Sequence, residues 1–563
     1  MITKEESKEL LRMRDTLKSL RSPYEKRWKM IAKWIDPLFY GSQEMDSPPD
    51  TNGLVDTNLC DTTISYYSQV FATGLQGYTC SSQSAFFELQ PEEMEKWREE
   101  DRELLVRILQ ARARKMYKQL ASSGFYSKLY GFFKSFGDLG TAVMFFGKTA
   151  DGKIYFEHIP TYQCLTMHNR VTGIVDTLFR TIYLTKYEIM QTYNLTEEEL
   201  PQEMRKKTSD DALKQWKVIQ LFCPRDRFEM SLSNGFKYAH IVWVAEAADL
   251  PIYEGGSDFL PFCVCSFGRS TDGTGLGVAS PGMRQVKSSK ALQKLLLDQL
   301  EAADLLASPP IKKTENVTAD ISPGAFITIP AGGDIAPMQL GSDLSWTSAC
   351  SQKLAVLAKS DYYVDFFLML SQYSGQVNTA TLAQGLQNEQ IKMMTFFLDV
   401  LKADFFEPII DWLYNAMGSE GMFNDGYNID YKNLQVDYVS PLFRIQQQAV
   451  TIEPTSNAMQ LVLPYMQIAP ELVAYIDFHA YASAVAEATG ADMRIIRTKA
   501  EAEEIISAQQ RAQQEAQQRQ MDIQQQEADT KTMLAAKTAA EPGSEAQQST
   551  SPYSGMTLGG NRL

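Results

Sequence analysis

The sequence offers little that could bind a metal or do redox chemistry. Its seven cysteines are odd in number and scattered, and its four histidines show none of the spacings typical of metal sites. We therefore expect free, buried thiols in a reducing compartment, and no metal. Cys263 and Cys265 have no second pair, and their alternation with Phe262 and Val264 favours a strand.

Long apolar runs are also missing. No stretch of about 18 uninterrupted apolar residues occurs, and residues 1–20 are charged throughout, so we expect neither a membrane span nor a signal peptide. The net charge of −15 argues against a protein that grips nucleic acid over its whole surface, but it suits one that lets DNA slide past. A chain of 563 residues has room for two to four domains.

No catalytic motif is complete. Gly147-Lys148-Thr149 resembles the end of a phosphate-binding loop, but the glycine required five positions earlier is Ala142. A hairpin turn at Asp151-Gly152 stands where the motif needs a helix. The glycines at 273, 275 and 277 lack the strand-turn-helix context of a dinucleotide site and better fit a hinge before Pro281. We therefore expect a protein that is not an enzyme and carries no cofactor.

Residues 275–371 contain the pattern around which the chain is organised. Ser280 offers an N-cap oxygen and Pro281 suits a first helical position, so we predict a helix that runs to Ala307. Its length is about 40 Å at ~1.5 Å per residue. Pro309-Pro310 prevents its continuation. A second helix is predicted from Asp343 to Leu370.

A small lobe separates these two helices. Turn-forming Ser322-Pro323-Gly324 and Gly332-Gly333-Asp334 flank the β-favouring residues 325–330, so we predict short strands and turns over residues 311–340. Two long helices that carry a lobe bury too little surface to be stable alone. Copies packed around an axis would supply the missing burial, so we expect a homo-oligomer.

The first of these helices has two distinct faces. Leucines 292, 296 and 300 share one stripe with Ala303, which we expect to pack. Lys287, Lys290 and Lys294 lie with Glu301 on roughly the opposite stripe. In a ring, these three lysines would form positive bands lining a pore and touch DNA phosphates briefly; the alternative is a solvated helix face.

The remaining segments indicate an α+β protein that is mainly helical. Helices are predicted over Met1–Trp34, Asp61–Gly74 and Gln90–Leu120, followed by strands through Tyr253. Seven basic and no acidic residues lie between Arg107 and Lys134, either as a solvated face or as a surface for phosphate or a partner.

The C-terminal half adds a loop and further helices. Residues 375–385 are small and polar and predict a mobile loop, which opens into a helix running to Ala416. Pro408 should kink this helix or end its first part. Helix is expected again from residue 445. The Gln-rich residues 501–537 can form a long polar helix that only neighbours could hold, and residues 541–563 are expected to be disordered.

A series of short motifs follows a distinctive order along the chain: Asp61-Thr62-Thr63, Phe71-Ala72-Thr73-Gly74-Leu75, Phe86-Phe87-Glu88-Leu89, Ser123-Gly124-Phe125-Tyr126, Asp138-Leu139-Gly140-Thr141-Ala142, Ile159-Pro160, Gly173-Ile174-Val175-Asp176 with Arg180, Pro261-Phe262, Gly275 to Pro281, Asn378-Thr379-Ala380-Thr381, and Ser440-Pro441-Leu442 with Arg444 and Gln446. This order resembles that of the head-to-tail connector, or portal, proteins of short-tailed bacteriophages, from about Trp28 to Arg497. Two departures from the family pattern are Leu276-Gly277-Val278-Ala279, in place of a Tyr-Gly-Arg segment, and Leu382, where many members carry Glu.

The resemblance implies a portal fold assembled as a ring, usually a dodecamer. It divides the chain into an N-terminal α+β wing (1–277), a stem helix (278–307), a β clip (308–341), a second stem helix (342–371), a channel loop and wing helix (372–448), a crown with a Gln-rich helical barrel (449–537), and a disordered tail (538–563).

The resemblance also implies a function and partners. Such rings are assembled in the host cytoplasm and sit at one capsid vertex of the virion, where double-stranded DNA passes through them without sequence-specific binding. The large terminase subunit docks on the clip, followed by tail adaptor and nozzle proteins, and the ring meets the major capsid and scaffolding proteins but no membrane. The residues expected to line the channel are Lys287, Lys290, Lys294, Gln376, Asn378 and Thr379; those expected to dock partners are Lys312, Lys313, Phe326 and Asp334.

Two alternatives to a portal stay open. A nucleotide-driven DNA-processing or motor subunit would hydrolyse ATP and lose that activity on Lys148→Ala. A virion scaffold or adaptor without a pore would show no central hole in negative-stain images.

Overall fold

A computed structural model describes residues 2–41, 59–92, 99–149, 152–205, 214–227, 235–247, 249–313, 344–373, 388–427 and 429–444, with short pieces between 329 and 337 and isolated residues from 481 onward. The chain divides into two compact units. The first comprises residues 1–465 and 488–490; the second comprises 466–487 and 491–563. Every element below belongs to the first unit.

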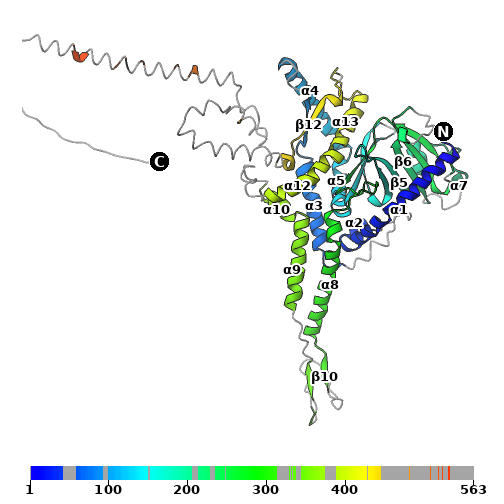
Figure 1. The fold of residues 1–563 in the computed structure, drawn as a ribbon, viewed down its shortest axis with the longest axis vertical. Coiled ribbons are helices and arrows are strands. Elements are labelled where there is room, and N and C mark those ends of the chain that lie inside the picture. Colours follow the sequence, from blue (N-terminus) through cyan, green and yellow to red (C-terminus); the bar gives the residue numbers. More distant parts are fainter. Residues whose placement is uncertain are drawn as a thin grey trace, which may run out of the picture. The chain divides into compact units, whose positions relative to one another are not determined.

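The N-terminal helix α1 (Lys4–Trp34) packs along one face of a β-sheet (Figure 1). A capping box starts the helix, because the Thr3 side chain accepts a hydrogen bond from the Glu6 N–H while the Glu6 carboxylate binds the Thr3 backbone. Leu10 and Leu17 then pack against strand residues such as Leu165 and Trp243. The helix predicted over Met1–Trp34 is confirmed.

The larger sheet has five antiparallel strands in the order β4-β5-β6-β7-β8. Helices α6 (Lys186–Tyr193) and α7 (Gln202–Arg205) contribute Ile189 and Met204 to a second hydrophobic cluster with this sheet. Its strands are β4 (Cys164–His168), β5 (Val175–Thr185), β6 (Gln215–Pro224), β7 (Tyr238–Val244) and β8 (Tyr253–Ser257). Short 3-10 turns lie at Thr161–Gln163, Arg225–Arg227 and Ala245–Ala247.

A smaller antiparallel sheet, β3-β2-β9, packs against the larger one through Val143, Phe145 and Phe222. Its strands are β2 (Thr141–Lys148), β3 (Ile154–Ile159) and β9 (Phe262–Ser266). The strand expected at Cys263 and Cys265 is confirmed, and burial raises the pKa of both thiols well above the ordinary value.

The helical part of the unit surrounds a core rich in aromatic side chains, including Phe71, Phe132, Phe405 and Phe406. A two-stranded sheet of β1 and β12 borders it. The elements are α2 (Pro37–Tyr40), α3 (Thr63–Thr79), β1 (Phe87–Pro91), α4 (Glu99–Ser122), α5 (Phe125–Leu139), α10 (Val364–Tyr373), α12 (Asn388–Leu401), the π-helix η6 (Lys402–Phe406), α13 (Glu407–Ser419), the 3-10 turn η7 (Tyr431–Asn433) and β12 (Leu434–Tyr438).

Two helices extend side by side from this body (Figure 1): α8 (Pro281–Ala307) and α9 (Leu344–Asp361). We call them the stem. The predicted start is confirmed, because the Ser280 hydroxyl accepts a hydrogen bond from the Met283 N–H and Pro281 occupies the first turn. Beyond the stem, β10 (Ile311–Lys313) pairs antiparallel with β11 (Ile335–Pro337).

Three predicted helices differ from the structure. The helix expected over Asp343–Leu370 is interrupted, since Tyr363 has φ of 53° and separates α9 from α10. The beginning of the helix expected over Gln90–Leu120 is wrong: Gln90 lies in β1, where it pairs with Gln435. Pro408 does not end its helix, because the wide π-turn η6 lies just before it and accommodates the missing N–H.

Several predictions lie outside the described residues: the loop at 375–385, the strand at 325–330, the helices from 445 and the Gln-rich segment. Within the ranges that the structure describes, no helix is long and apolar enough to cross a membrane.

Candidate functional site

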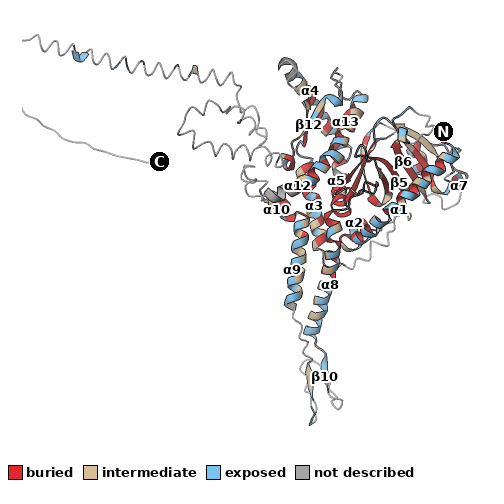
Figure 2. Cartoon of the chain, viewed as in Figure 1, coloured by how far each residue is buried: buried red, intermediate tan, exposed pale blue. Residues whose placement is uncertain are grey.

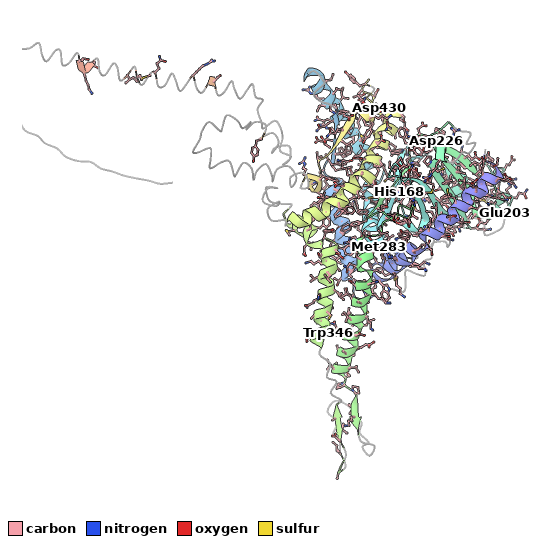
Figure 3. The ribbon with its side chains drawn as sticks, in the orientation of Figure 1. His168, Glu203, Asp226, Met283, Trp346 and Asp430 are labelled. Atoms are coloured by element: carbon pink, nitrogen blue, oxygen red, sulfur yellow. The ribbon has the colours of Figure 1, made fainter. Side chains whose placement is uncertain are left out.

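The stem exposes, along both of its helices, apolar side chains of the kind that a folded chain normally buries. On α9, Trp346 is 68% exposed and Val356 is 64% exposed. Figure 2 shows this exposure along both helices, and Figure 3 places Trp346 toward the end of α9 that leads to β11, with Met283 at the opposite end of the stem. The other exposed apolar residues of the stem are Leu297, Leu300, Leu305, Leu306 and Leu357.

The stripe expected to pack on α8 does so only in part. Leu292 is buried, but Leu300 and Ala303 are exposed. One neighbouring helix covers only part of the circumference of α8, and at about 100° per residue the run Leu295-Leu296-Leu297 cannot lie on one side. The apolar surface of the stem therefore exceeds what α8 and α9 can bury against each other.

The basic stripe on α8 lies where the sequence places it. Lys287, Lys290 and Lys294 are all exposed, and none forms an ion pair with any residue that the structure describes. The Lys290 ammonium is 5.9 Å from the centroid of the Trp34 ring, which the Lys33 ammonium also approaches at 5.3 Å. The stripe thus runs beside the C-terminal end of α1.

A buried polar cluster anchors the stem to the body. The Asp138 carboxylate, at the end of α5, accepts hydrogen bonds from the Tyr362 hydroxyl at 2.7 Å, the Tyr40 hydroxyl at 2.9 Å and the Ser68 hydroxyl at 2.7 Å. Burial, reinforced by the charge of Asp138, raises the pKa of Tyr362 well above the ordinary value. Because Tyr362 follows α9 directly, Asp138 fixes the body end of that helix.

Lys134 supplies the positive charge of this cluster. Its ammonium is 2.9 Å from an Asp36 oxygen and 3.7 Å from an Asp138 oxygen, and it donates a hydrogen bond to the Ser68 hydroxyl at 2.9 Å. Burial alone would lower the pKa of Lys134, but Asp138 and Asp36 together raise it, so the ammonium stays charged.

The first turn of α8 meets the same residue. The Ser280 hydroxyl donates a hydrogen bond to the Asp138 carbonyl at 3.0 Å. A Cβ on Gly282 would lie 2.5 Å from the Asp138 Cα, and one on Gly277 would lie 1.9 Å from the Gly140 carbonyl oxygen. Only glycine permits these approaches, so both stem helices are fixed at their body ends through Asp138 and its neighbours.

The paired strands beyond the stem carry the expected partner-docking residues. Lys312 is exposed in β10 opposite Ala336, Lys313 is opposite Ile335, and Asp334 is exposed just before β11. Phe326 lies outside the described residues, as do Gln376, Asn378 and Thr379 of the expected channel loop.

The basic run from Arg107 to Lys134 does not form one surface. Arg112 is buried and holds Asp425 in a bidentate pair, with Nε–Oδ2 at 2.6 Å and Nη2–Oδ1 at 2.8 Å. Lys115 donates a hydrogen bond to the Phe423 carbonyl, and Lys134 lies in the buried cluster. These three residues stabilise the fold, while others, such as Arg114 and Lys128, are exposed.

The partial phosphate-loop motif has another role. Gly147 and Lys148 lie in β2, and the Lys148 ammonium pairs with Glu420 at 2.6 Å and donates to the Ala416 carbonyl at 3.2 Å. The Thr149 N–H closes the hairpin on the Lys153 carbonyl at 2.9 Å. Across the described part of the chain, no group of His, Cys, Asp and Glu residues could hold a metal ion.

An α+β body that projects a paired-helix stem with unburied apolar surface is typical of a protein that binds other molecules through that surface. The model of one family, "Bacteriophage head to tail connecting protein", matches residues 7–496, so the chain belongs to this family. Its function is that of a phage portal, or head-to-tail connector, a structural component of the virion, and a role in DNA packaging follows from the family.

Two curated relatives are similar along most of their length. The "Portal protein" of Salmonella phage epsilon15 is 21% identical over 505 residues, which cover 87% of this chain and 89% of that relative. The "Probable portal protein" of Bordetella phage BPP-1 is 23% identical over 512 residues, which cover 88% of this chain and 90% of that relative.

Proposed function

We propose that copies of this chain close into a ring, a dodecamer in the virion, with the stems packed around a channel for double-stranded DNA. The observation that carries the proposal is the exposed apolar surface of the stem, at Leu305, Leu306, Trp346, Val356 and Leu357. Burying each such side chain contributes about 1.5–3 kcal/mol. A head-to-tail contact repeated around an axis would bury them in every subunit at once.

Each part of the chain then has an assigned place. Residues 1–277 and the helices after the channel loop form the wing, α8 and α9 the stem, residues 308–341 the clip, and residues 449–537 the crown and barrel. The ring sits at one vertex of the capsid, where it contacts the major capsid and scaffolding proteins. The resemblance to the portal family supports this division.

Double-stranded DNA passes through the channel without base-specific contacts. Lys287, Lys290 and Lys294 are unpaired among the described residues and would neutralise phosphates only briefly, together with the polar loop residues Gln376, Asn378 and Thr379. The net charge of −15 keeps the remaining surface from holding DNA. Affinity should therefore be weak, independent of sequence and steeply dependent on salt.

The clip docks first the large terminase subunit and then the tail adaptor and nozzle proteins, through Lys312, Lys313, Phe326 and Asp334. Deleting Ile311–Leu340 should leave rings intact, because the contacts that assemble the subunits lie in the wing and the stem. Terminase binding, measured by pull-down, should be lost. Loss of the rings themselves would contradict this division of labour.

Negative-stain imaging of the purified full-length chain tests the proposal directly. We expect rings with a central hole wide enough for a DNA duplex, and class averages that give the subunit number. Images of isolated globular particles, at concentrations where the exposed stem residues should already drive association, would overturn it. Closed particles without a hole would favour an adaptor.

A further inference from the structure

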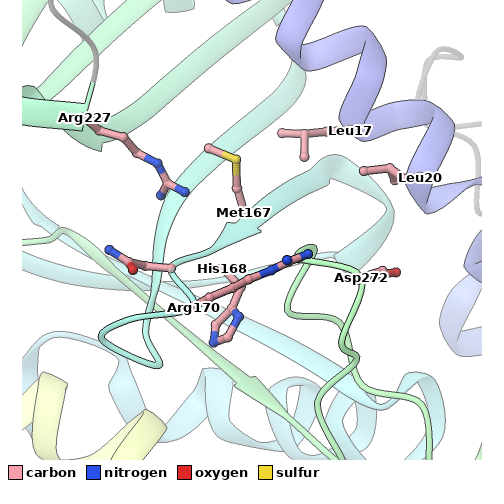
Figure 4. Close-up of a pocket in the computed structure, with 9 residues that line it drawn as sticks. Leu17, Leu20, Met167, His168, Arg170, Arg227 and Asp272 are labelled. Carbon is pink, nitrogen blue, oxygen red and sulfur yellow. The ribbon is translucent and has the colours of Figure 1, made fainter.

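An open cleft of about 450 Å³ lies where α1 crosses the β4 edge of the five-stranded sheet. Leu17 and Leu20 of α1 and Met167 of β4 form its apolar wall (Figure 4). Arg170, Arg227 and Asp272 contribute charged groups on the other sides. The volume admits one large side chain of another molecule.

Two of the three charged groups are already satisfied. Arg227 pairs with Asp176 and also donates to the Thr177 hydroxyl at 3.2 Å. The Asp272 carboxylate accepts hydrogen bonds from the Tyr24 hydroxyl at 2.8 Å and from the N–H of Thr274 at 2.9 Å, among others. Neither group requires a further partner.

Arg170 has no such partner. Its guanidinium forms no hydrogen bond or ion pair with any residue that the structure describes, and it lies against Gly273, where a Cβ would be 3.4 Å from Nη2. The next residue in the same turn, Val171, is 94% exposed, and Leu20 is exposed at the cleft. An unpaired cation beside exposed apolar side chains matches a partner that presents a carboxylate next to an apolar side chain.

The same chain presents that combination at the opposite edge of the sheet. Asp258 and Phe259 follow β8 directly and both are exposed. Like Arg170, the Asp258 side chain has no hydrogen bond or ion pair within the described ranges. A free carboxylate therefore stands beside an exposed aromatic ring.

The strand register places the two patches at one end of the sheet. His168 pairs with Val175 at the start of β5, which runs antiparallel to β6 so that its start lies beside the end of β6. Pro224 at the end of β6 pairs with Tyr238, and Tyr238 pairs with Ser257. Arg170 and Asp258 thus lie at the same end but on opposite edges, about 19 Å apart at ~4.8 Å per strand spacing.

We propose that Asp258 and Phe259 of one subunit dock into the Arg170 cleft of the next copy of this chain. The Asp258 carboxylate pairs with the Arg170 guanidinium, and the Phe259 ring enters between Leu17, Leu20 and Met167. Because the two patches are different and lie on opposite edges, the contact is head-to-tail and repeats around an axis. This inference rests on the proposed ring.

A nucleic acid fits the cleft less well. Gripping a DNA backbone requires a row of free cations, and the cleft offers Arg170 as its single unpaired one among the described residues. The apolar wall of Leu17, Leu20 and Met167 would meet no complementary group on a phosphate chain.

Cysteine crosslinking between differently marked chains tests the contact. Arg170→Cys and Asp258→Cys chains, mixed before assembly and oxidised gently, should give a covalent dimer that a reducing agent cleaves. Either variant alone should give only the background of the native cysteines. The matched control pairs Arg170→Cys with Glu203→Cys, which is exposed on α7 over the sheet's other face and should give no dimer.

Charge exchange provides a second measurement. Arg170→Glu should raise the concentration at which half of the chains assemble by about tenfold, Asp258→Arg should do the same, and the double variant should recover most of the loss. If rings form but neither the crosslink nor the recovery appears, the docking contact is wrong and the ring proposal stands. If wild-type protein forms no rings and the mixed Arg170→Cys and Asp258→Cys chains give no crosslink, both proposals fail.

Discussion

The two ends of the stem differ in what surrounds them. At the body end, Asp138 receives three hydrogen bonds, and Gly282 in the first turn of α8 lies against its backbone. At the far end, Leu305 and Trp346 face solvent. A single chain therefore buries the polar cluster that anchors the stem, but it does not bury the apolar side chains at the far end of the stem. Folding depends on the first end and, in the proposed ring, assembly depends on the second, although both ends belong to the same two helices.

The largest effect is expected at the anchor. Asp138→Ala removes the acceptor of Tyr362, Tyr40 and Ser68 and leaves Lys134 with one carboxylate, so the free energy of unfolding should fall by about 3–5 kcal/mol. Urea unfolding would measure this change. As a control, Asp298→Ala on the exposed side of α8 should change it by less than about 0.5 kcal/mol. Equal losses of unfolding free energy in the Asp138 and Asp298 variants would show that the anchor is no more important for folding than the exposed stem.

At the far end, Trp346→Ser should act on assembly alone. The exposed ring adds little to the fold of one chain, but burying it against a neighbour would contribute about 2–3 kcal/mol. Sedimentation should show the half-assembly concentration rising by about 30- to 150-fold, while the free energy of unfolding of the monomer is unchanged. Gln352→Ser, on another side of α9, serves as the control. If the Trp346 variant assembles at the same concentration as wild type, the Trp346 ring is not buried between subunits.

A smaller effect, on the pH dependence of stability, is expected in the five-stranded sheet rather than in the stem. Burial lowers the pKa of His240 to about 3, and its ring stacks on Phe222 at 4.3 Å. Below about pH 6.5 the unfolded chain binds a proton that the folded chain excludes, so stability falls as pH falls.

His240→Phe keeps the stacked ring and removes this proton. Between pH 6.5 and 5 the variant should lose about 2 kcal/mol less stability than wild type. His158, whose pKa burial lowers to about 4, stays in both proteins and contributes equally to both curves. Urea unfolding at a series of pH values measures the difference. Parallel curves for the two proteins would show that His240 is protonated in the folded state.

The sequence predicted helix and strand boundaries well wherever one or two residues determine the local backbone conformation. Ser280 and Pro281 fix the start of α8, and Gly152, with a φ of 76°, lies in the turn of the predicted β2-β3 hairpin. The break at Tyr363 was missed because no glycine or proline marks it; the hydrogen bond from neighbouring Tyr362 to Asp138 holds the chain there. Tertiary contacts of this kind override local propensity.

The candidate site was only partly predictable for the same reason. The basic stripe on α8 follows from helical spacing, and its three lysines are exposed on that helix, while their place in a channel stays a prediction. The roles of Lys134 and Asp138 depend on side chains from four distant segments. One sequence signal could have found them. Lys134 and Asp138 lie four residues apart in a helix that also contains Phe132, Phe133 and Phe136, so the helix is expected to be buried. Buried charges need polar partners, which indicates a buried polar cluster.

The π-helix η6 sets the rotational phase of α13, which follows it directly. Five residues at π-helical spacing let Phe405 and Phe406 both point into the core, and α13 then presents Trp412 and Leu413 to the same interior. Removing one residue would turn α13 by about 100° and bring its polar side inward. We therefore expect an insertion or deletion within residues 402–406 to disrupt the packing of α13, whichever side chains those positions carry.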